Sequence, residues 1–155
     1  MGRYYNTNSG REGKFMFGVQ PSDDPGEMGM REQDPTMITY YADDNDVELI
    51  KENLDKQYDV LGVPKADRIY YCKTNKEMAD YEDKTLRSSV WVDVREDDEV
   101  EMKKHEKDTR WYCPKDGYVS FEIPGKALAL ARVRLALIIL SDIKDEGYCS
   151  LDAEL

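Results

Sequence analysis

Short segments of alternating apolar and polar residues recur along the chain, a pattern typical of half-buried β-strands. In one of them Val90, Val92 and Val94 occupy alternate positions. Three segments show this period, 14–20, 88–94 and 118–123, and the segments 36–42 and 68–73 are further strand candidates. The pattern therefore predicts about five strands.

A period near 3.6 residues predicts two long helices. The first covers 43–61, and Gly62 and Pro64 follow it in the order that is typical of a helix end. The second covers 126–146 and is apolar on nearly every face, so it should be buried on more than one side. A shorter helix is predicted near 75–86, and the charged run 96–110 is predicted to be a loop or a frayed helix.

Tyrosine pairs suggest that one strand–helix unit is used twice. Tyr40-Tyr41 precedes Asn45 by the same spacing with which Tyr70-Tyr71 precedes Asn75. We therefore expect an α/β or α+β fold of about five strands, with a βαβ unit of parallel strands and the long apolar C-terminal helix packed on the sheet. The polar, glycine-rich residues 1–13 predict a flexible or docked N-terminal arm, and 14–155 are predicted to form a single globular domain.

The chain is strongly acidic, with 22 basic and 33 acidic side chains and a net charge of −11. Between residues 21 and 59 there are twelve acids and three bases. This field repels phosphate backbones, which argues against direct nucleic-acid binding, and it repels anionic membranes. The longest apolar run, 127–140, contains two arginines and is too short for a membrane span. A basic protein is therefore the expected partner.

Acidic clusters and tyrosine pairs are the candidates for a partner-binding surface, because tyrosine is enriched at protein interfaces. The acids of 43–46 also have a structural interpretation as a helix start, and tyrosine favours strands in any case. The candidate residues are Asp23, Asp24, Asp43, Asp44, Asp46, Tyr40, Tyr41, Tyr70 and Tyr71.

Two arginines interrupt the most apolar helix. Arg132 and Arg134 lie roughly 200° apart around the helix axis, so both cannot face one direction. At least one should pair with an acid or enter an interface, because an unpaired buried charge is very costly. We therefore predict an interface with a second copy of the chain, formed by Arg132, Arg134, Leu130 and Leu137.

Three cysteines, Cys72, Cys113 and Cys149, form no C-x-x-C pair, which favours reduced thiols in a cytoplasmic setting without a signal peptide. Together with His105 they supply the residue types of a zinc site. Their wide spacing instead favours buried thiols and a surface histidine. The sequence also lacks the EF-hand, phosphate-loop and nucleophile-elbow motifs, so we expect no metal and no cofactor.

Both ends of the chain resemble an uncharacterised family of small proteins of large DNA viruses. The resemblance rests on 10–24, which reads GREGKFMFGVQPSDD, and on 145–151, which reads DEGYCSL. It implies a virus-encoded accessory protein that works in the cytoplasm of a host cell. It implies no fold, activity or site residue.

The preferred function is a non-enzymatic interaction protein that binds a basic protein surface, with a nucleic-acid mimic as one subtype. Electrostatic interactions would set the specificity of binding, and apolar contacts would supply the affinity. Two alternatives come from other classes. One is a small carboxylate- or metal-dependent enzyme, and the other is a virion structural component whose apolar helix makes lattice contacts.

Overall fold

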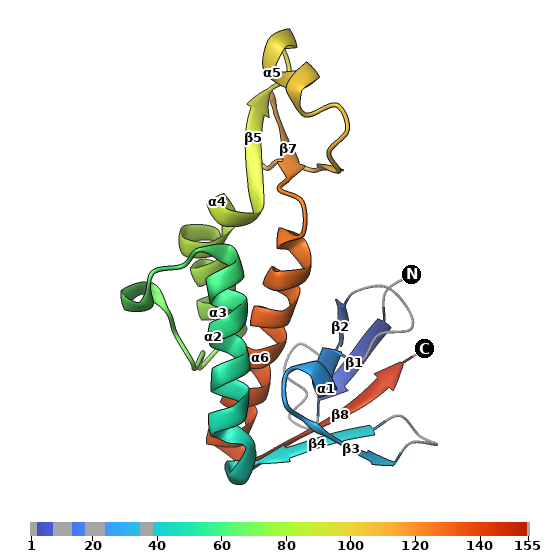
Figure 1. Cartoon of the computed structure of the whole chain (residues 1–155), viewed down its shortest axis with the longest axis vertical. Helices are drawn as coiled ribbons and strands as arrows, with labels where there is room; N and C mark the ends of the chain where they lie inside the picture. Colours follow the sequence, from blue (N-terminus) through green and yellow to red (C-terminus); the bar gives the residue numbers. More distant parts are fainter. Residues whose placement is uncertain (1–2, 8–13, 18–23, 35–38, 155) are drawn as a thin grey trace.

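The computed structural model describes residues 3–7, 14–17, 24–34 and 39–154. Its strands and helices form an elongated molecule in which α6 (Lys126–Glu146) is the central element (Figure 1). The other helical elements are α1 (Asp24–Glu27), the 3₁₀ turns Asp44–Asp46 and Lys65–Asp67, α2 (Val47–Leu61), α3 (Asn75–Tyr81), the π-turn Glu82–Leu86, α4 (Arg87–Val90) and α5 (Glu99–Lys104). The strands are β1 (Arg3–Thr7), β2 (Lys14–Phe17), β3 (Arg31–Asp34), β4 (Thr39–Asp43), β5 (Trp91–Arg95), β6 (Arg110–Trp111), β7 (Tyr118–Glu122) and β8 (Tyr148–Glu154).

Helix α6 has the bounds that the sequence predicts, and twelve of its 21 residues are buried. Helix α2 packs along one side of it through Ile50, Leu54, Tyr58 and Leu61. The last turn of α2 ends at Gly62, whose φ of +73° allows its N–H to close onto the carbonyls of Tyr58 and Asp59. Both predicted long helices are therefore confirmed, including the glycine that ends the first.

A five-stranded sheet covers the C-terminal half of α6, in the order β2-β1-β8-β4-β3 (Figure 1). Tyr40 and Ala42 of β4 alternate with more exposed neighbours and join Cys149 and Leu151 of β8 in the main core. The central strand β8 directly follows Gly147, where a φ of +88° turns the chain back from the helix. The long helix thus packs on the sheet, as predicted.

Every strand pair in the described residues is antiparallel, so the fold is α+β and the predicted βαβ unit does not form. The predicted strand 68–73 is absent, because side chains of α2 occupy its backbone groups. The Tyr58 hydroxyl donates to the carbonyl of Ile69 at 2.7 Å and accepts from its N–H at 3.4 Å. Arg68 is bound to α2 as well, with its guanidinium 2.6 Å from Asp59.

The N-terminal region contributes to the larger sheet. Residues 3–7 form strand β1, between β2 and β8, whereas 8–13 lie outside the described residues. The acidic stretch that begins at residue 21 contains α1 and β3 among its described residues. Between these two elements Met28 and Met30 are buried, and Gly29 has a φ of +109°. A Cβ at position 29 would lie 3.1 Å from Asn53 Nδ2, so a glycine lets this turn close onto α2.

A second, three-stranded sheet projects beyond the N-terminal end of α6 (Figure 1). Its strand order is β5-β7-β6, and we call residues 91–123, which contain these strands and α5, the distal unit. Val94, Val119 and Phe121 form a small apolar cluster of their own there, with Val92 and Met102 packed against it. The helical segment α3–π-turn–α4 leads into this unit along α6.

We expect Leu137→Ala to lower the free energy of unfolding by about 3 kcal/mol, because the substitution leaves a cavity in the core. Leu137 is 1% exposed and packs inside the chain, whereas Leu128 of the same helix is 41% exposed. Leu128→Ala should therefore change the free energy by no more than about 0.5 kcal/mol. Urea denaturation measures both values. Two equally small changes would contradict a core position for Leu137.

Candidate protein-interaction surface

The predicted acids at the start of α2 act mainly as helix caps. The Asp43 carboxylate accepts from the N–H of Asn45 at 3.0 Å, and the Asp46 carboxylate accepts from the N–H of Asp43 at 2.9 Å. Both acids also contact Arg31, at 3.4 Å and 3.0 Å. Asp44 remains exposed. The carboxylates of Asp43 and Asp46 therefore interact mainly with groups of their own chain.

The other two predicted acids belong to the region before β3. Asp24 is the first residue of α1, and Asp23 lies outside the described residues. Further along α2, Asp55 and Asp59 hold Arg68, whose side chain is only 6% exposed. The hydrogen bond that Arg68 donates to Asp59 raises the pKa of Arg68. These acids therefore bind the loop after α2, and Asp44, Glu48 and Glu52 are the exposed acids of the first turns.

The four predicted tyrosines also have partners within the chain. Tyr40 is buried in the core, and Tyr41 stacks on Tyr148 with 6.0 Å between the ring centroids. The Tyr70 hydroxyl donates to Asp55 at 2.5 Å. The Tyr71 hydroxyl donates to Asp145 at 3.0 Å, and Lys144 Nζ lies 4.0 Å from the centre of its ring.

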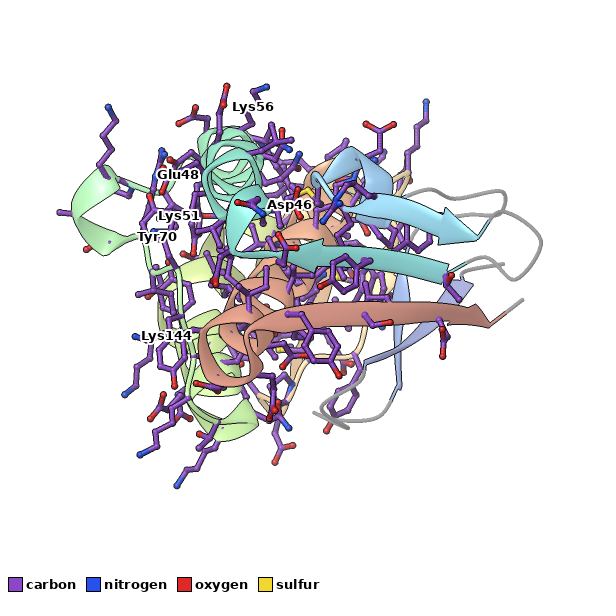
Figure 2. The ribbon with its side chains drawn as sticks, turned by 90° about the horizontal axis from the view of Figure 1, so that it is seen from below. Asp46, Glu48, Lys51, Lys56, Tyr70 and Lys144 are labelled. Atoms are coloured by element: carbon purple, nitrogen blue, oxygen red, sulfur yellow. The ribbon has the colours of Figure 1, made fainter. Side chains whose placement is uncertain are left out.

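These acids and tyrosines do not form one surface. Figure 2 shows Asp46 on the side of α2 that faces β3, and Tyr70 on the other side, near Glu48 and Lys51. Lys51 Nζ lies 5.9 Å from the centre of the Tyr70 ring, so a positive charge accompanies this tyrosine. The fold thus brings Tyr41, Asp43 and Asp46 together around Arg31, whereas Tyr70 lies on the other side of α2.

The residues predicted for an oligomer interface are largely engaged within their own chain. Arg134 forms a two-pronged ion pair with Glu82, at 2.7 Å and 2.9 Å, which raises the pKa of Arg134. Arg132 is half-buried. Leu130 and Leu137 are 4% and 1% exposed and belong to the core of their own chain. The prediction that an arginine pairs with an acid therefore fits Arg134, whereas the two leucines are not available to a second copy.

Exposed aromatic side chains gather instead on the distal unit. Trp111 of β6 is 45% exposed, and the adjacent Tyr112 is 87% exposed. Trp111 packs edge-on against Trp91, with 6.1 Å between the ring centroids, and its indole Nε1 donates to Glu122 at 3.1 Å. Trp111 is thus exposed and already held in place. Sequence reasoning missed it because Arg110-Trp111 ends a charged run without an alternating pattern.

A cavity of about 450 Å³ opens beside these aromatic residues. Trp111, Tyr112 and Tyr118 supply its aromatic lining. Its charged groups are Glu96, Arg110, Lys115 and Asp116. Arg110 lies 3.9 Å from Glu96, and Lys115 Nζ lies 4.1 Å from the centre of the Tyr118 ring. The two bases therefore have partners in the cavity, and Asp116 is an exposed acid at its wall.

Arg87, at the start of α4, connects the helical body to the distal unit. Its Nη2 donates to Ser120 Oγ at 2.9 Å and lies 3.2 Å from Asp93 Oδ1, and its guanidinium lies 5.2 Å from the Trp91 ring. The Ser120 hydroxyl donates to Asp93 at 2.6 Å. These contacts fix β5 and β7 relative to the helix, and they support Trp91, on which Trp111 packs.

The candidate zinc ligands lie in separate parts of the fold. The His105 ring stacks on Phe121 with 5.3 Å between the centroids, and its Nδ1 is 2.9 Å from Asp108. The three cysteines are buried, with Cys113 beside Arg87 in the distal unit and Cys149 in β8. Within the described ranges, no group of three or more histidine, cysteine or acidic side chains could hold a metal ion. His105 instead packs as part of the distal unit.

No helix in the described part of the chain is both long enough and apolar enough to cross a membrane. Comparison with protein-family models, with curated proteins and with solved structures found no match. Any functional assignment therefore depends on the chemistry of the surface itself.

We expect Tyr70 to make stability depend on pH in the alkaline range. Its hydrogen bond to Asp55 raises the pKa of Tyr70 from 10.0 to about 12. The folded chain thus keeps a proton that the unfolded chain loses, so this contribution is complete below pH 10 and is lost as the pH rises through 12. The free energy of unfolding of the wild type should fall towards that of Tyr70→Phe between these pH values.

Chemical denaturation at several alkaline pH values measures this difference. An Asp55→Asn background serves as the control, because without the carboxylate the effect of Tyr70→Phe should vary less with pH. If the difference in the free energy of unfolding between wild type and Tyr70→Phe stays constant across these pH values, the assigned hydrogen bond is contradicted.

Proposed function

We propose that the chain is a non-enzymatic protein-interaction module that binds a basic protein through the distal unit. The observation that carries the proposal is the exposure of Trp111 and Tyr112 side by side on an acidic projection. Tryptophan and tyrosine dominate the binding energy of many protein interfaces. Because Trp91 and Glu122 already hold Trp111, its side chain loses little freedom when a partner binds.

The charge of the distal unit favours a basic partner. Residues 91–123 contain ten acidic and six basic side chains. Asp116 is exposed at the wall of the cavity beside the aromatic residues, where a lysine or arginine of a partner would meet its carboxylate. Such charges mainly speed association and set specificity, and the aromatic contacts supply affinity. A protein that itself binds nucleic acid is one class of partner with the required charge.

The setting of this interaction is the cytoplasm, of a host cell if the protein is viral. The alternatives, a carboxylate- or metal-dependent enzyme and a virion structural component, stay predictions. In the described residues no observation favours either alternative over the exposed aromatic surface.

We expect the tagged wild-type protein to retain a basic protein from a cell lysate at low salt and to release it at high salt, where exposed charges are screened. The double variant Trp111→Ser/Tyr112→Ser should weaken capture by about 30-fold or more, since an aromatic interface anchor contributes about 2 kcal/mol or more. Quantitative mass spectrometry of the bound fraction measures both effects.

Val100→Ser is the matched control, because Val100 is 68% exposed on α5 of the same unit but does not line the cavity. It should leave capture unchanged. Equal capture by the double variant and the control would contradict the proposed surface.

A further inference from the structure

Strand β6 is the outer strand of the distal sheet, and its hydrogen-bond pattern shows which peptide groups face outward. It pairs with β7 in the register Arg110↔Phe121 and Trp111↔Ser120, and the N–H of Glu122 donates to the carbonyl of Thr109 at 2.8 Å. Hydrogen-bonded and non-hydrogen-bonded pairs alternate along an antiparallel ladder. Trp111 therefore directs its peptide groups to β7, and Arg110 directs its N–H and C=O away from the sheet.

This outward edge lies next to the surface that the proposed function uses. Trp111 lies in β6 and the exposed Tyr112 directly follows it, so a strand laid along β6 would meet both aromatic side chains. The cavity, with Glu96 and Asp116 in its wall, is continuous with this edge because Arg110, Trp111 and Tyr112 all line it. Backbone pairing and aromatic contact thus coincide at one place, on a unit whose ten acidic side chains outnumber its six basic ones.

We propose that β6 captures an extended basic segment of the partner protein as a fourth strand of the distal sheet. The main-chain bonds to Arg110 would supply affinity, and alternate side chains would supply specificity, as in other cases of strand addition. This inference depends on the proposed function, since it specifies how the partner binds. It also extends that function, because the partner is then recognised as an exposed chain segment and not as a folded basic surface.

Charge complementarity selects the occupant. A second copy of the chain carries the same net charge of −11, so edge-to-edge pairing of two copies is opposed by repulsion. An extended segment in which lysine or arginine alternates with apolar residues meets both the acids and the aromatic side chains.

The test uses the full chain and a capped peptide of alternating lysine and valine as the probe. A second peptide has the same sequence but carries N-methyl groups on alternate residues, which removes the donors along one edge while the charge stays the same. We expect the N-methylated peptide to bind about tenfold more weakly, because hydrogen bonds at the edge are lost. The amide of Arg110 should exchange about tenfold more slowly with the unmodified peptide bound, as measured by NMR.

Two variants isolate the outward donor within the chain. Arg110→Pro removes the N–H and the charge, whereas Arg110→Ala removes the charge alone. Only Arg110→Pro should reduce binding of the unmodified peptide to the level of the N-methylated one. If Arg110→Pro disturbs folding, the comparison of the two peptides on the wild-type chain still decides the question.

The outcomes separate this inference from the proposed function. Equal binding of both peptides, with no protection of the Arg110 amide, would overturn strand addition and leave a side-chain-mediated interaction. Failure of the unmodified peptide to bind, while a lysate protein is still captured through Trp111 and Tyr112, would also overturn it. Failure of both the peptide and the lysate capture would overturn the proposed function as well.

Discussion

Helix α6 is apolar on nearly every side, and the rest of the fold is arranged to cover it. An apolar surface this wide must be removed from water on more than one face. Helix α2 covers one side of α6, the α3–α4 segment packs beside α6, and the five-stranded sheet covers the C-terminal half of α6. Burial of the helix also explains why Arg134 is paired with an acid. The charge of Arg134 is neutralised by Glu82 of the π-turn.

The distal unit has only a small apolar cluster of its own, so its position depends on polar contacts with the helical body. Arg87 supplies them by binding Ser120 and Asp93 and by lying against Trp91. Since Trp111 packs on Trp91, the same arginine indirectly orients the exposed aromatic surface. Structure and proposed binding are thus linked through one side chain at the start of α4.

Local patterns predicted the elements whose stability is local. The bounds of α6 and the end of α2 at Gly62 follow from periodicity and capping, and β7 follows from alternation. The predicted strand 88–94 is correct only from Trp91 onward, because 88–90 belong to α4. The pattern could not reveal that Tyr58 would occupy the backbone of Ile69, so segment 68–73 was wrongly predicted as a strand. The central strand β8 was missed because its partners, β1 and β4, are distant in sequence. The candidate site was missed for a similar reason, since the exposure of Trp111 depends on tertiary packing.

The most direct measurement compares amide hydrogen exchange in the wild type and in Arg87→Met. Arg95→Met is the control, because among the described contacts the side chain of Arg95 pairs only with the exposed Asp97. Loss of charged hydrogen bonds of this kind costs about 1.5 kcal/mol, or roughly tenfold in local opening. Arg87→Met should accelerate exchange in β5 and β7 by about that factor and leave the middle of α6 unchanged. Unchanged exchange in β5 and β7, or equal acceleration throughout α6, would contradict the role of Arg87 in holding the distal unit.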